Sequence, residues 1–219
     1  NILQVLSFHV KAQITSFSLD PDKPLYIIFT SGTTGIPKGV VIQRKSYEHF
    51  INWLDEYFDT IDQENNLLFI ADFSFDMSLL DIGLFLCKQC NAYFTKFNGN
   101  TFRLAYEIQT FQINSIATVP SNINLLLKDD IFDRADYSSL DHLLLGGSRF
   151  SYKAYENINQ KLSSMVNTYN FFGPTEATVY TNVHKLVGDE NLDLKDSNVT
   201  IGRPFGGNIC ILIDSKGNV

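Results

Sequence analysis

Hydroxyl-bearing residues, glycines and one lysine gather in a short loop near the start of the chain. In LYIIFTSGTTGIPKGVVIQ, residues 25–43, an apolar run is followed by four hydroxyls, three glycines and the lysine, and then by a second apolar run. Glycines let a backbone come close to a ligand with its N–H groups exposed, and lysine adds a mobile positive charge. This composition predicts a phosphate-binding loop between two strands.

The loop differs from the P-loop of nucleoside triphosphatases. That motif has Gly before its Lys, Ser or Thr after it, and then a helix. Here Lys38 stands between Pro37 and Gly39, and the β-branched run at 40–42 predicts a strand. Turn residues are also common between paired strands, so an ordinary hairpin connection is the alternative interpretation.

Composition indicates a folded, acidic protein. Of the 219 residues, 44% are hydrophobic and 19% charged, which disfavours disorder. The net charge of −7 disfavours nucleic acid as a partner, because phosphate backbones are held by basic patches. No apolar run approaches the roughly 20 residues of a membrane span, and no secretory signal opens the chain. We therefore expect a cytoplasmic protein with neither a nucleic-acid nor a membrane partner.

The cysteines and histidines do not predict a metal or disulfide site. Three cysteines are too few for a disulfide framework. Cys87 and Cys90 form a single C-x-x-C without the second pair that a zinc site needs. Their expected place is the end of a helix, whereas redox motifs stand at a helix N-terminus. We expect two packing cysteines, and the four scattered histidines suggest no metal.

Strands and helices alternate along most of the chain, which predicts parallel βαβ units. Apolar runs predict strands at 25–30, 40–43, 67–70, 92–95, 115–119, 142–145 and 165–169. Apolar residues at helical spacing predict helices at 45–58, 77–87, 102–111, 120–128 and 152–162. From residue 178 onward strands follow one another, which predicts a small antiparallel appendage. The expected fold class is α/β with a parallel sheet.

Polar or glycine-rich clusters follow four of the predicted strands. They are the loop at 30–39, FSFD at 73–76, GGS at 146–148 and NFFGPTE at 170–176. Ligands of open α/β sheets bind at the carboxyl ends of the strands. We therefore expect the four clusters to converge on one rim of the sheet.

Three motifs in this order resemble those of the adenylate-forming superfamily: TSGTTGIPKG at 30–39, FDMS at 75–78 and NFFGPTE at 170–176. This group includes the amino-acid adenylation domains of nonribosomal peptide synthetases, D-alanine–carrier-protein ligases, acyl-CoA synthetases and luciferases. The final segment, IGRPFGGNICILIDSKGNV, resembles the one that leads into the family's β-barrel. The resemblance implies the family's large N-terminal domain, with an α/β core at 1–185 and the start of a β-barrel at 186–219.

The reaction that the resemblance implies is the activation of a carboxylic acid by Mg·ATP. The carboxylate attacks the α-phosphate and pyrophosphate leaves. A thiol then takes the acyl group, often the thiol of a phosphopantetheine arm. Such steps depend on positioning and on charge stabilisation. The implied cofactors are ATP and Mg²⁺, and the implied partners are an amino acid and a phosphopantetheinyl carrier protein.

The matched motifs imply the nucleotide contacts residue by residue. Lys38, Thr175 and Glu176 would be catalytic, with Thr175 at the α-phosphate and the Glu176 carboxylate on Mg²⁺, a cation that prefers oxygen ligands. The loop contacts to the nucleotide would be Thr30, Ser31, Gly32, Thr33, Thr34, Gly35 and Lys38. The adenine side would be formed by Gly147, Ser148, Asn170, Phe171, Phe172 and Gly173. Core packing is the alternative for the two phenylalanines.

The FDMS motif narrows the implied substrate to an amino acid. In the amino-acid-activating branch the Asp of this motif, here Asp76, pairs with the substrate's α-ammonium. A carboxylate in an apolar pocket needs such a cation, although a helix N-cap is the alternative role for Asp76. The pocket would be lined by Asp76, Met77, Leu80, Thr118, Leu144, Gly146, Phe171, Val179 and Tyr180. This mostly apolar lining suggests a small or medium uncharged side chain, such as that of D-alanine.

Several of the family's motifs are missing from these 219 residues. There is no G-E-L-x-I-x-G stretch, no T-G-D whose Asp would hold the ribose, and no C-terminal small domain with its catalytic Lys. We therefore expect a partial adenylation domain that turns over poorly by itself, within an active parent protein. Two alternatives stay open: an acyl- or aryl-CoA ligase, which has no ammonium for Asp76 to bind, and a nucleotide-binding scaffold that has lost its chemistry.

Overall fold

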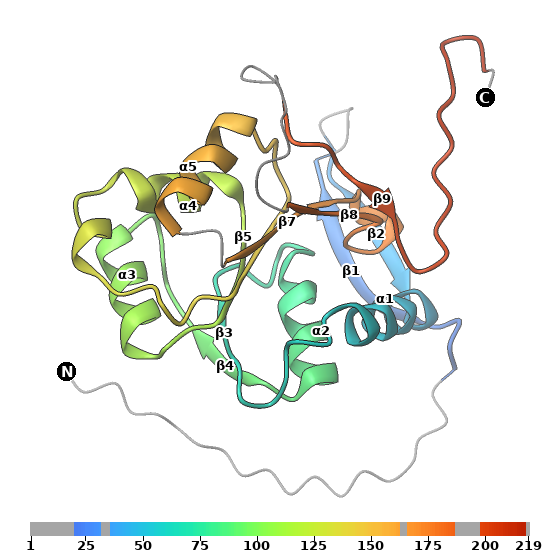
Figure 1. Ribbon diagram of the computed structural model, residues 1–219. Helices are drawn as coiled ribbons and strands as arrows, with labels where there is room; N and C mark the ends of the chain where they lie inside the picture. Colours follow the sequence, from blue (N-terminus) through green and yellow to red (C-terminus); the bar gives the residue numbers. More distant parts are fainter. Residues whose placement is uncertain (1–19, 32–35, 163–165, 187–197, 218–219) are drawn as a thin grey trace, which may run out of the picture.

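The computed structural model describes residues 20–31, 36–162, 166–186 and 198–217. At its centre lies a seven-stranded sheet with the order β4-β3-β5-β6-β7-β8-β9 (Figure 1). The strands β4, β3, β5, β6 and β7 are parallel, and β8 and β9 are antiparallel to their neighbours. Their bounds are β3 Asn66–Phe69, β4 Asn91–Phe94, β5 Ser115–Thr118, β6 His142–Leu145, β7 Asn167–Phe172, β8 Asn182–Leu186 and β9 Arg203–Pro204. The predicted α/β class with a parallel sheet is confirmed.

Within the described residues, five α-helices cover the two faces of this sheet (Figure 1). They are α1 Arg44–Tyr57, α2 Ser78–Lys88, α3 Thr101–Thr110, α4 Pro120–Lys128 and α5 Tyr152–Leu162. Local sequence sets their starts: the Asn100 side chain accepts a hydrogen bond from the Arg103 amide at the head of α3. Pro120 occupies the first turn of α4, where a missing N–H costs nothing. Two short 3₁₀ turns, η1 Phe132–Arg134 and η2 Thr175–Ala177, complete the helical elements of the described residues.

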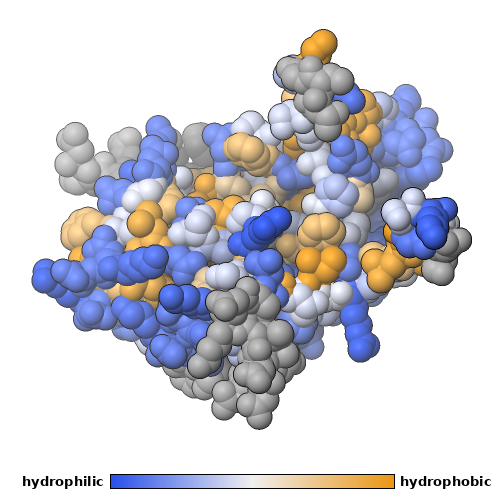
Figure 2. All heavy atoms as spheres, turned by 90° about the horizontal axis from the view of Figure 1, so that it is seen from above, coloured by the Kyte–Doolittle hydropathy of each residue, from blue (hydrophilic) through white to orange (hydrophobic). Residues whose placement is uncertain are grey.

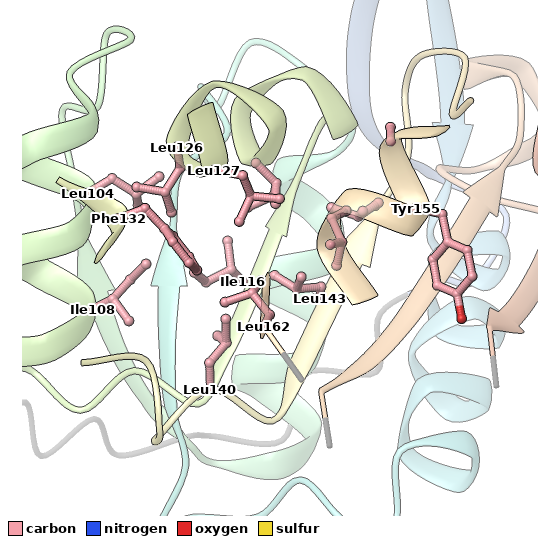
Figure 3. Close-up of a cluster of buried hydrophobic side chains, with 14 of the residues drawn as sticks. Leu104, Ile108, Ile116, Leu126, Leu127, Phe132, Leu140, Leu143, Tyr155 and Leu162 are labelled. Atoms are coloured by element: carbon pink, nitrogen blue, oxygen red, sulfur yellow. The ribbon is translucent and has the colours of Figure 1, made fainter. Parts of the chain in front are cut away.

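Each face of the sheet has its own hydrophobic core. One core joins α3, α4 and α5 to the sheet (Figure 3), and the other joins α1 and α2 to it. Successive residues of β6 alternate between them: Leu143 and Leu145 belong to the first core and Leu144 to the second. The apolar residues of β6 are buried on both faces, as expected for a parallel sheet between two helical layers.

The strand at the head of the glycine-rich loop does not belong to the central sheet. β1 Pro24–Thr30 pairs in antiparallel fashion with β2 Lys38–Gln43, and Thr30 lies opposite Lys38. Our expectation that the strand before this loop belongs to the same sheet as the strands before the other three clusters is therefore wrong. The connection is too short for the crossover of a dozen or more residues that a parallel pair needs, so the two strands form a hairpin.

The tail is antiparallel, as predicted, but it extends the central sheet instead of forming a separate appendage. β8 pairs with β7, and β9 pairs with β8. The domain boundary predicted at 185–186 stays a prediction. Seen from above, hydrophobic and hydrophilic residues are interspersed on the surface, with hydrophobic ones along the middle (Figure 2). No helix in the described ranges is long and apolar enough to cross a membrane.

Candidate functional site

A first cavity lies at the carboxyl ends of β6 and β7 and is named here the Phe172 cavity. Its volume is about 380 Å³. It is lined by Gly147, Ser148, Arg149, Phe150, Asn170, Phe171, Phe172, Gly173, Asn198, Val199 and Ile201. The structure thus brings together all six residues that were predicted to form the adenine side.

The two phenylalanines of β7 have opposite surroundings, because successive residues of a strand point to opposite faces. Phe171 is 3% exposed and packs against the rings of Trp53, Phe58 and Tyr180. Phe172 is 48% exposed and free to stack on a planar ligand. The packing alternative therefore holds for the Phe171 side chain, and Phe172 supplies the aromatic wall of the cavity.

Asn170 holds the far wall of the Phe172 cavity in place. Its side chain is buried, and Nδ2 donates a hydrogen bond of 2.8 Å to the carbonyl oxygen of Thr200. Thr200 lies between Val199 and Ile201, which line the same cavity. The Asn170 amide nitrogen is therefore occupied within the protein.

A second cavity, named here the Asp76 cavity, has a volume of about 420 Å³. Five of the predicted pocket residues line it, namely Asp76, Met77, Thr118, Val179 and Tyr180. The cavity is also lined by Gly147, Gly173 and Thr175, which were assigned to the nucleotide, and by Ile70, Ala71, Phe75, Val119, Asn122 and Pro174, which the motifs did not identify. Most of this lining is apolar, so the carboxylate of Asp76 is the exceptional group.

Asp76 does not cap the helix that follows it. The N-cap residue of α2 is Met77, and the cap has no side-chain hydrogen bond. The alternative role of Asp76 as a helix N-cap is therefore wrong, and its carboxylate is not used in starting the helix.

The expected lining of the Asp76 cavity is corrected at four positions. Leu80 and Leu144 are 0% and 1% exposed and lie inside the α1–α2 core. Phe171 packs in the same core. Gly146 lies behind Tyr180, since a Cβ added there would be 2.6 Å from Tyr180 Oη. Leu80, Leu144 and Phe171 therefore belong to the core rather than to the cavity lining.

Gly147 and Gly173 line both cavities. Gly147 has a φ of +75°, a conformation that favours glycine. A Cβ at Gly173 would lie 2.4 Å from the Cα of Tyr180, so a larger residue cannot be placed there without moving the backbone. Glycine at both positions keeps the partition between the cavities thin, and a ligand can extend from one to the other.

Two phenols lie in the electrostatic field of Asp76. Burial raises the pKa of Tyr180, and the carboxylates of Asp76 and Asp81 raise it further. Burial also raises the pKa of Tyr26, to which Asp76 adds a second contribution. The Tyr26 hydroxyl is buried and has no hydrogen-bond partner among the described residues. Both phenols therefore remain protonated and uncharged at neutral pH.

The predicted phosphate loop is only partly within the described residues. Gly32, Thr33, Thr34 and Gly35 lie outside them. Thr30 and Lys38 end the paired part of the hairpin, and Ser31 follows as an exposed residue. β2 packs against η2, the turn that contains Thr175 and Glu176. The hairpin is thus held beside the predicted catalytic pair, although none of its described residues lines the two cavities.

Thr175 and Glu176 face different spaces. Thr175 lines the Asp76 cavity, whereas Glu176 lines a third cavity of about 550 Å³ beside Lys45 and His49. Glu176 is exposed, and within the described ranges its carboxylate has neither a hydrogen bond nor an ion pair. A free carboxylate of this kind fits the oxygen ligand that Mg²⁺ requires.

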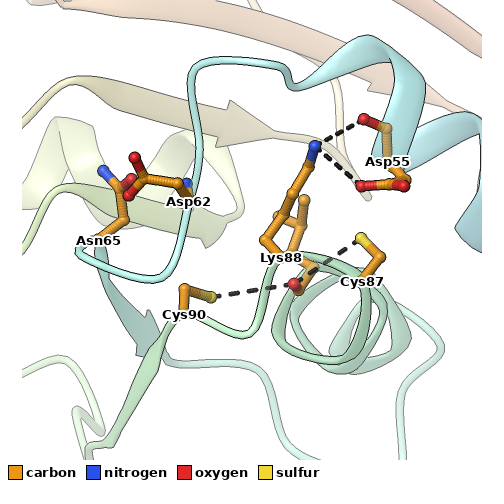
Figure 4. A network of polar contacts seen from close by, with 7 residues as sticks. Asp55, Asp62, Asn65, Cys87, Lys88 and Cys90 are labelled. Carbon is orange, nitrogen blue, oxygen red and sulfur yellow. Dashed lines mark hydrogen bonds and ion pairs between the residues drawn. The ribbon is translucent and has the colours of Figure 1, made fainter.

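The C-x-x-C lies at the C-terminal end of α2 (Figure 4). The thiols of Cys87 and Cys90 both donate to the carbonyl oxygen of Leu84, at 3.8 and 3.9 Å. Burial raises the pKa of Cys87 to about 11, so this thiol is protonated and unreactive at neutral pH. The prediction of two packing cysteines is confirmed, and the described part of the chain contains no cluster of three or more metal-binding side chains.

Comparisons with known proteins agree on one family. A family model described as "AMP-binding enzyme" matches residues 5–219. A D-alanine–D-alanyl carrier protein ligase of Lactococcus lactis subsp. lactis strain IL1403 is 32% identical over 177 residues, which cover 80% of this chain and 35% of that protein. Surfactin synthase subunit 1 of Bacillus subtilis strain 168 is 29% identical over 203 residues, 89% of this chain and 5% of that protein.

Solved structures show the same fold. The crystal structure of the Vibrio cholerae adenylation domain AlmE in complex with glycyl-adenosine-5'-phosphate superimposes with a TM-score of 0.79, at 24% identity, over 91% of this chain and 36% of that one. CmiS6 gives a TM-score of 0.79 at 22% identity, over 93% of this chain and 47% of that one. The chain spans about a third of the length of the D-alanine ligases that it matches.

Proposed function

This chain belongs to the family of AMP-binding enzymes, and we propose that it activates an amino acid as its aminoacyl adenylate. One observation carries the proposal: a carboxylate, Asp76, lines a largely apolar cavity that adjoins the Phe172 cavity at Gly147 and Gly173. A carboxylate in apolar surroundings is stabilised by a cation. The α-ammonium of an amino acid is such a cation, with the reacting carboxylate attached one carbon away.

The two cavities suit the two halves of an aminoacyl adenylate. We assign the adenine ring to the Phe172 cavity, where the exposed ring of Phe172 offers a stacking surface. The aminoacyl group is assigned to the Asp76 cavity. The phosphate that joins them then passes the glycine partition near Thr175, which lines the Asp76 cavity.

The chemical step is a displacement at phosphorus. An oxygen of the substrate carboxylate forms a bond to the α-phosphorus of ATP, the bond from that phosphorus to the bridging oxygen breaks, and the electron pair leaves with pyrophosphate. The Thr175 hydroxyl would position the α-phosphate, and Lys38 would bind the phosphates that leave. Glu176 would hold Mg²⁺, which neutralises charge on the phosphate oxygens when bound.

We propose that a carrier protein receives the acyl group. The sulfur of its phosphopantetheine thiol would attack the acyl carbonyl, and AMP would leave with the electron pair of the broken C–O bond. Support comes from the relatives, several of which are named as D-alanine–D-alanyl carrier protein ligases.

The test is ATP–pyrophosphate exchange on the longest natural form of the protein that contains this chain, because the relatives are about three times longer. We expect exchange with one or a few amino acids and none with plain carboxylic acids. A response only to acids that lack an amine would move the protein to the CoA-ligase class. No response to any acid would favour a nucleotide-binding scaffold. The 219 residues alone, tested in parallel, are expected to exchange poorly.

A further inference from the structure

We propose that Asn122 selects the side chain of the substrate: the Asp76 cavity takes an amino acid whose side chain is longer than the methyl group of alanine and carries a hydrogen-bond donor. This inference rests on the proposed function and names its substrate class.

Asn122 is a half-buried polar residue in the wall of the Asp76 cavity, and a hydrogen bond fixes its side chain. It stands in the first turn of α4, and its Nδ2 donates a hydrogen bond of 2.8 Å to Oγ1 of Thr118. Thr118 ends β5 and is 2% exposed, so the anchor is fixed in the sheet. The carboxamide is therefore oriented before any ligand binds.

The carboxamide oxygen of Asn122 is available to accept a hydrogen bond from a ligand. Its Nδ2 is directed to Thr118, and within the described ranges no donor forms a hydrogen bond with its Oδ1. An amide oxygen accepts hydrogen bonds from hydroxyl, amide or ammonium groups. A ligand that supplies such a donor gains a hydrogen bond, and one that covers Asn122 with a methyl group buries an unpaired acceptor.

The other polar groups of the cavity have different tasks under the proposed function. Asp76 is assigned to the α-ammonium and Thr175 to the α-phosphate. The Tyr180 hydroxyl lies against Gly146. The Asn122–Thr118 pair is then the polar group that remains for the substrate's side chain, within a lining that is otherwise apolar.

The Asp76 cavity, which also includes the phosphate side near Thr175, is larger than an alanyl group requires. The Asp76 cavity measures about 420 Å³, whereas a cavity of roughly 150 Å³ accommodates benzene. Asn122, Ile70 and Ala71 also line a neighbouring cavity of about 860 Å³, to which Phe73 and Lys96 contribute. Asn122 therefore lies at the boundary between the two spaces.

The experiment compares pairs of amino acids that differ only by hydroxyl and methyl: serine with 2-aminobutyrate, homoserine with norvaline, and 5-hydroxynorvaline with norleucine. ATP–pyrophosphate exchange gives kcat/KM for each, in both configurations, on the longest natural form of the protein. We expect the hydroxyl compound of one of the two longer pairs to exceed its methyl partner by about 10-fold or more.

Two variants of α4 make the test specific. Asn122→Leu removes the acceptor, and we expect it to bring the hydroxyl-to-methyl ratio close to one. Asn124→Leu is the matched control: it makes the same change two residues later in α4, at a position that lines none of the described cavities around Asp76. The control is expected to keep the wild-type ratio.

The outcomes separate this inference from the proposed function. The role of Asn122 would be overturned if exchange were best with alanine or 2-aminobutyrate, or if the hydroxyl-to-methyl ratio were at or below one for every pair. Amino-acid activation would still stand in either case. A ratio unchanged in Asn122→Leu would do the same. No exchange with any amino acid would overturn the proposed function itself. If Asn122→Leu does not fold, the wild-type ratios alone decide.

Discussion

Two acidic side chains five positions apart on one segment have opposite surroundings. Asp76 lines a cavity, whereas Asp81 is 0% exposed and neither of its oxygens has a hydrogen-bond partner within the described ranges. Burial raises the pKa of Asp81 well above its usual value, because an apolar interior disfavours the charged form. The same residue type thus lines a cavity at one position and is enclosed in the core at the other.

A buried histidine gives the chain a pH dependence. His142 is 3% exposed, its Nε2 lies 3.3 Å from the Thr60 hydroxyl, and its Nδ1 has no partner within the described ranges. Burial lowers the pKa of His142; nearby Lys185 lowers it too, and Asp141 raises it. Because the folded-state pKa lies below the unfolded value of about 6.5, the unfolded chain binds the proton more readily. The stability that the neutral His142 contributes is therefore present above about pH 6.5 and is lost as the pH falls below this value.

We expect the urea midpoint of the wild type to fall from pH 7.5 to pH 5.5 more steeply than that of His142→Phe, which keeps a ring but cannot be protonated. Asp81 contributes the opposite slope, because its raised pKa favours folding as the pH decreases. The difference between the two proteins isolates His142. Equal slopes would show that His142 is not held neutral in the folded chain.

At the residue scale, only some of the residues predicted from the motifs line the Asp76 cavity. Asp76, Met77 and Thr118 were identified from motif positions and do line the cavity. Leu80 and Leu144 were identified in the same way and lie in the core. Asn122 was missed, since it looks like an ordinary polar residue in the first turn of a helix. Its proposed role depends on the hydrogen bond to Thr118, four residues earlier, which forms where the chain passes from β5 into α4.

At the scale of elements, the helices follow directly from the sequence and the strand order does not. The predicted helix at 45–58 is α1 Arg44–Tyr57, and the one at 152–162 is α5 Tyr152–Leu162, because apolar spacing is a local signal. Nothing local indicated that β1 leaves the sheet to pair with β2, or that β3 lies between β4 and β5. Pairing of strands is decided by contacts between distant segments.

A stacked pair of aromatic rings connects α1 to the residue that follows β9. The ring of Trp53 stacks on that of Phe205, just after β9, with centroids 3.5 Å apart and planes 12° from parallel. Trp53 is 7% exposed. We expect Trp53→Ala to lower the free energy of unfolding by about 3–5 kcal/mol.

Urea unfolding of both variants at neutral pH measures this effect. Tyr106→Ala serves as the control, because Tyr106 is also aromatic and helical but 56% exposed, and its loss is expected to change stability by no more than about 0.5 kcal/mol. A similar small effect for both variants would mean that the contact between α1 and the end of the sheet contributes little.

At the scale of the whole molecule, the site depends on loops from separate βαβ units. The segment before α2 supplies Asp76, the loop after β6 supplies Gly147, and the loop after β7 supplies Gly173 and Thr175. A parallel sheet places these loops at one edge. This is why motifs about 100 residues apart in the chain contribute to one pair of cavities, and why the rim was predictable from the sequence for the three clusters that belong to the sheet.

The most direct test of amino-acid activation compares an accepted amino acid with the same acid lacking its amine. The measurement is the ratio of their kcat/KM values in ATP–pyrophosphate exchange, in the wild type and in Asp76→Asn. Asp72→Asn is the control, because Asp72 lies four residues earlier and does not line the Asp76 cavity. Since removal of one partner of a buried ion pair costs about 3–5 kcal/mol, we predict that the ratio falls at least about 100-fold in Asp76→Asn and is unchanged in Asp72→Asn. An unchanged ratio in Asp76→Asn would contradict the assignment of the α-ammonium to Asp76.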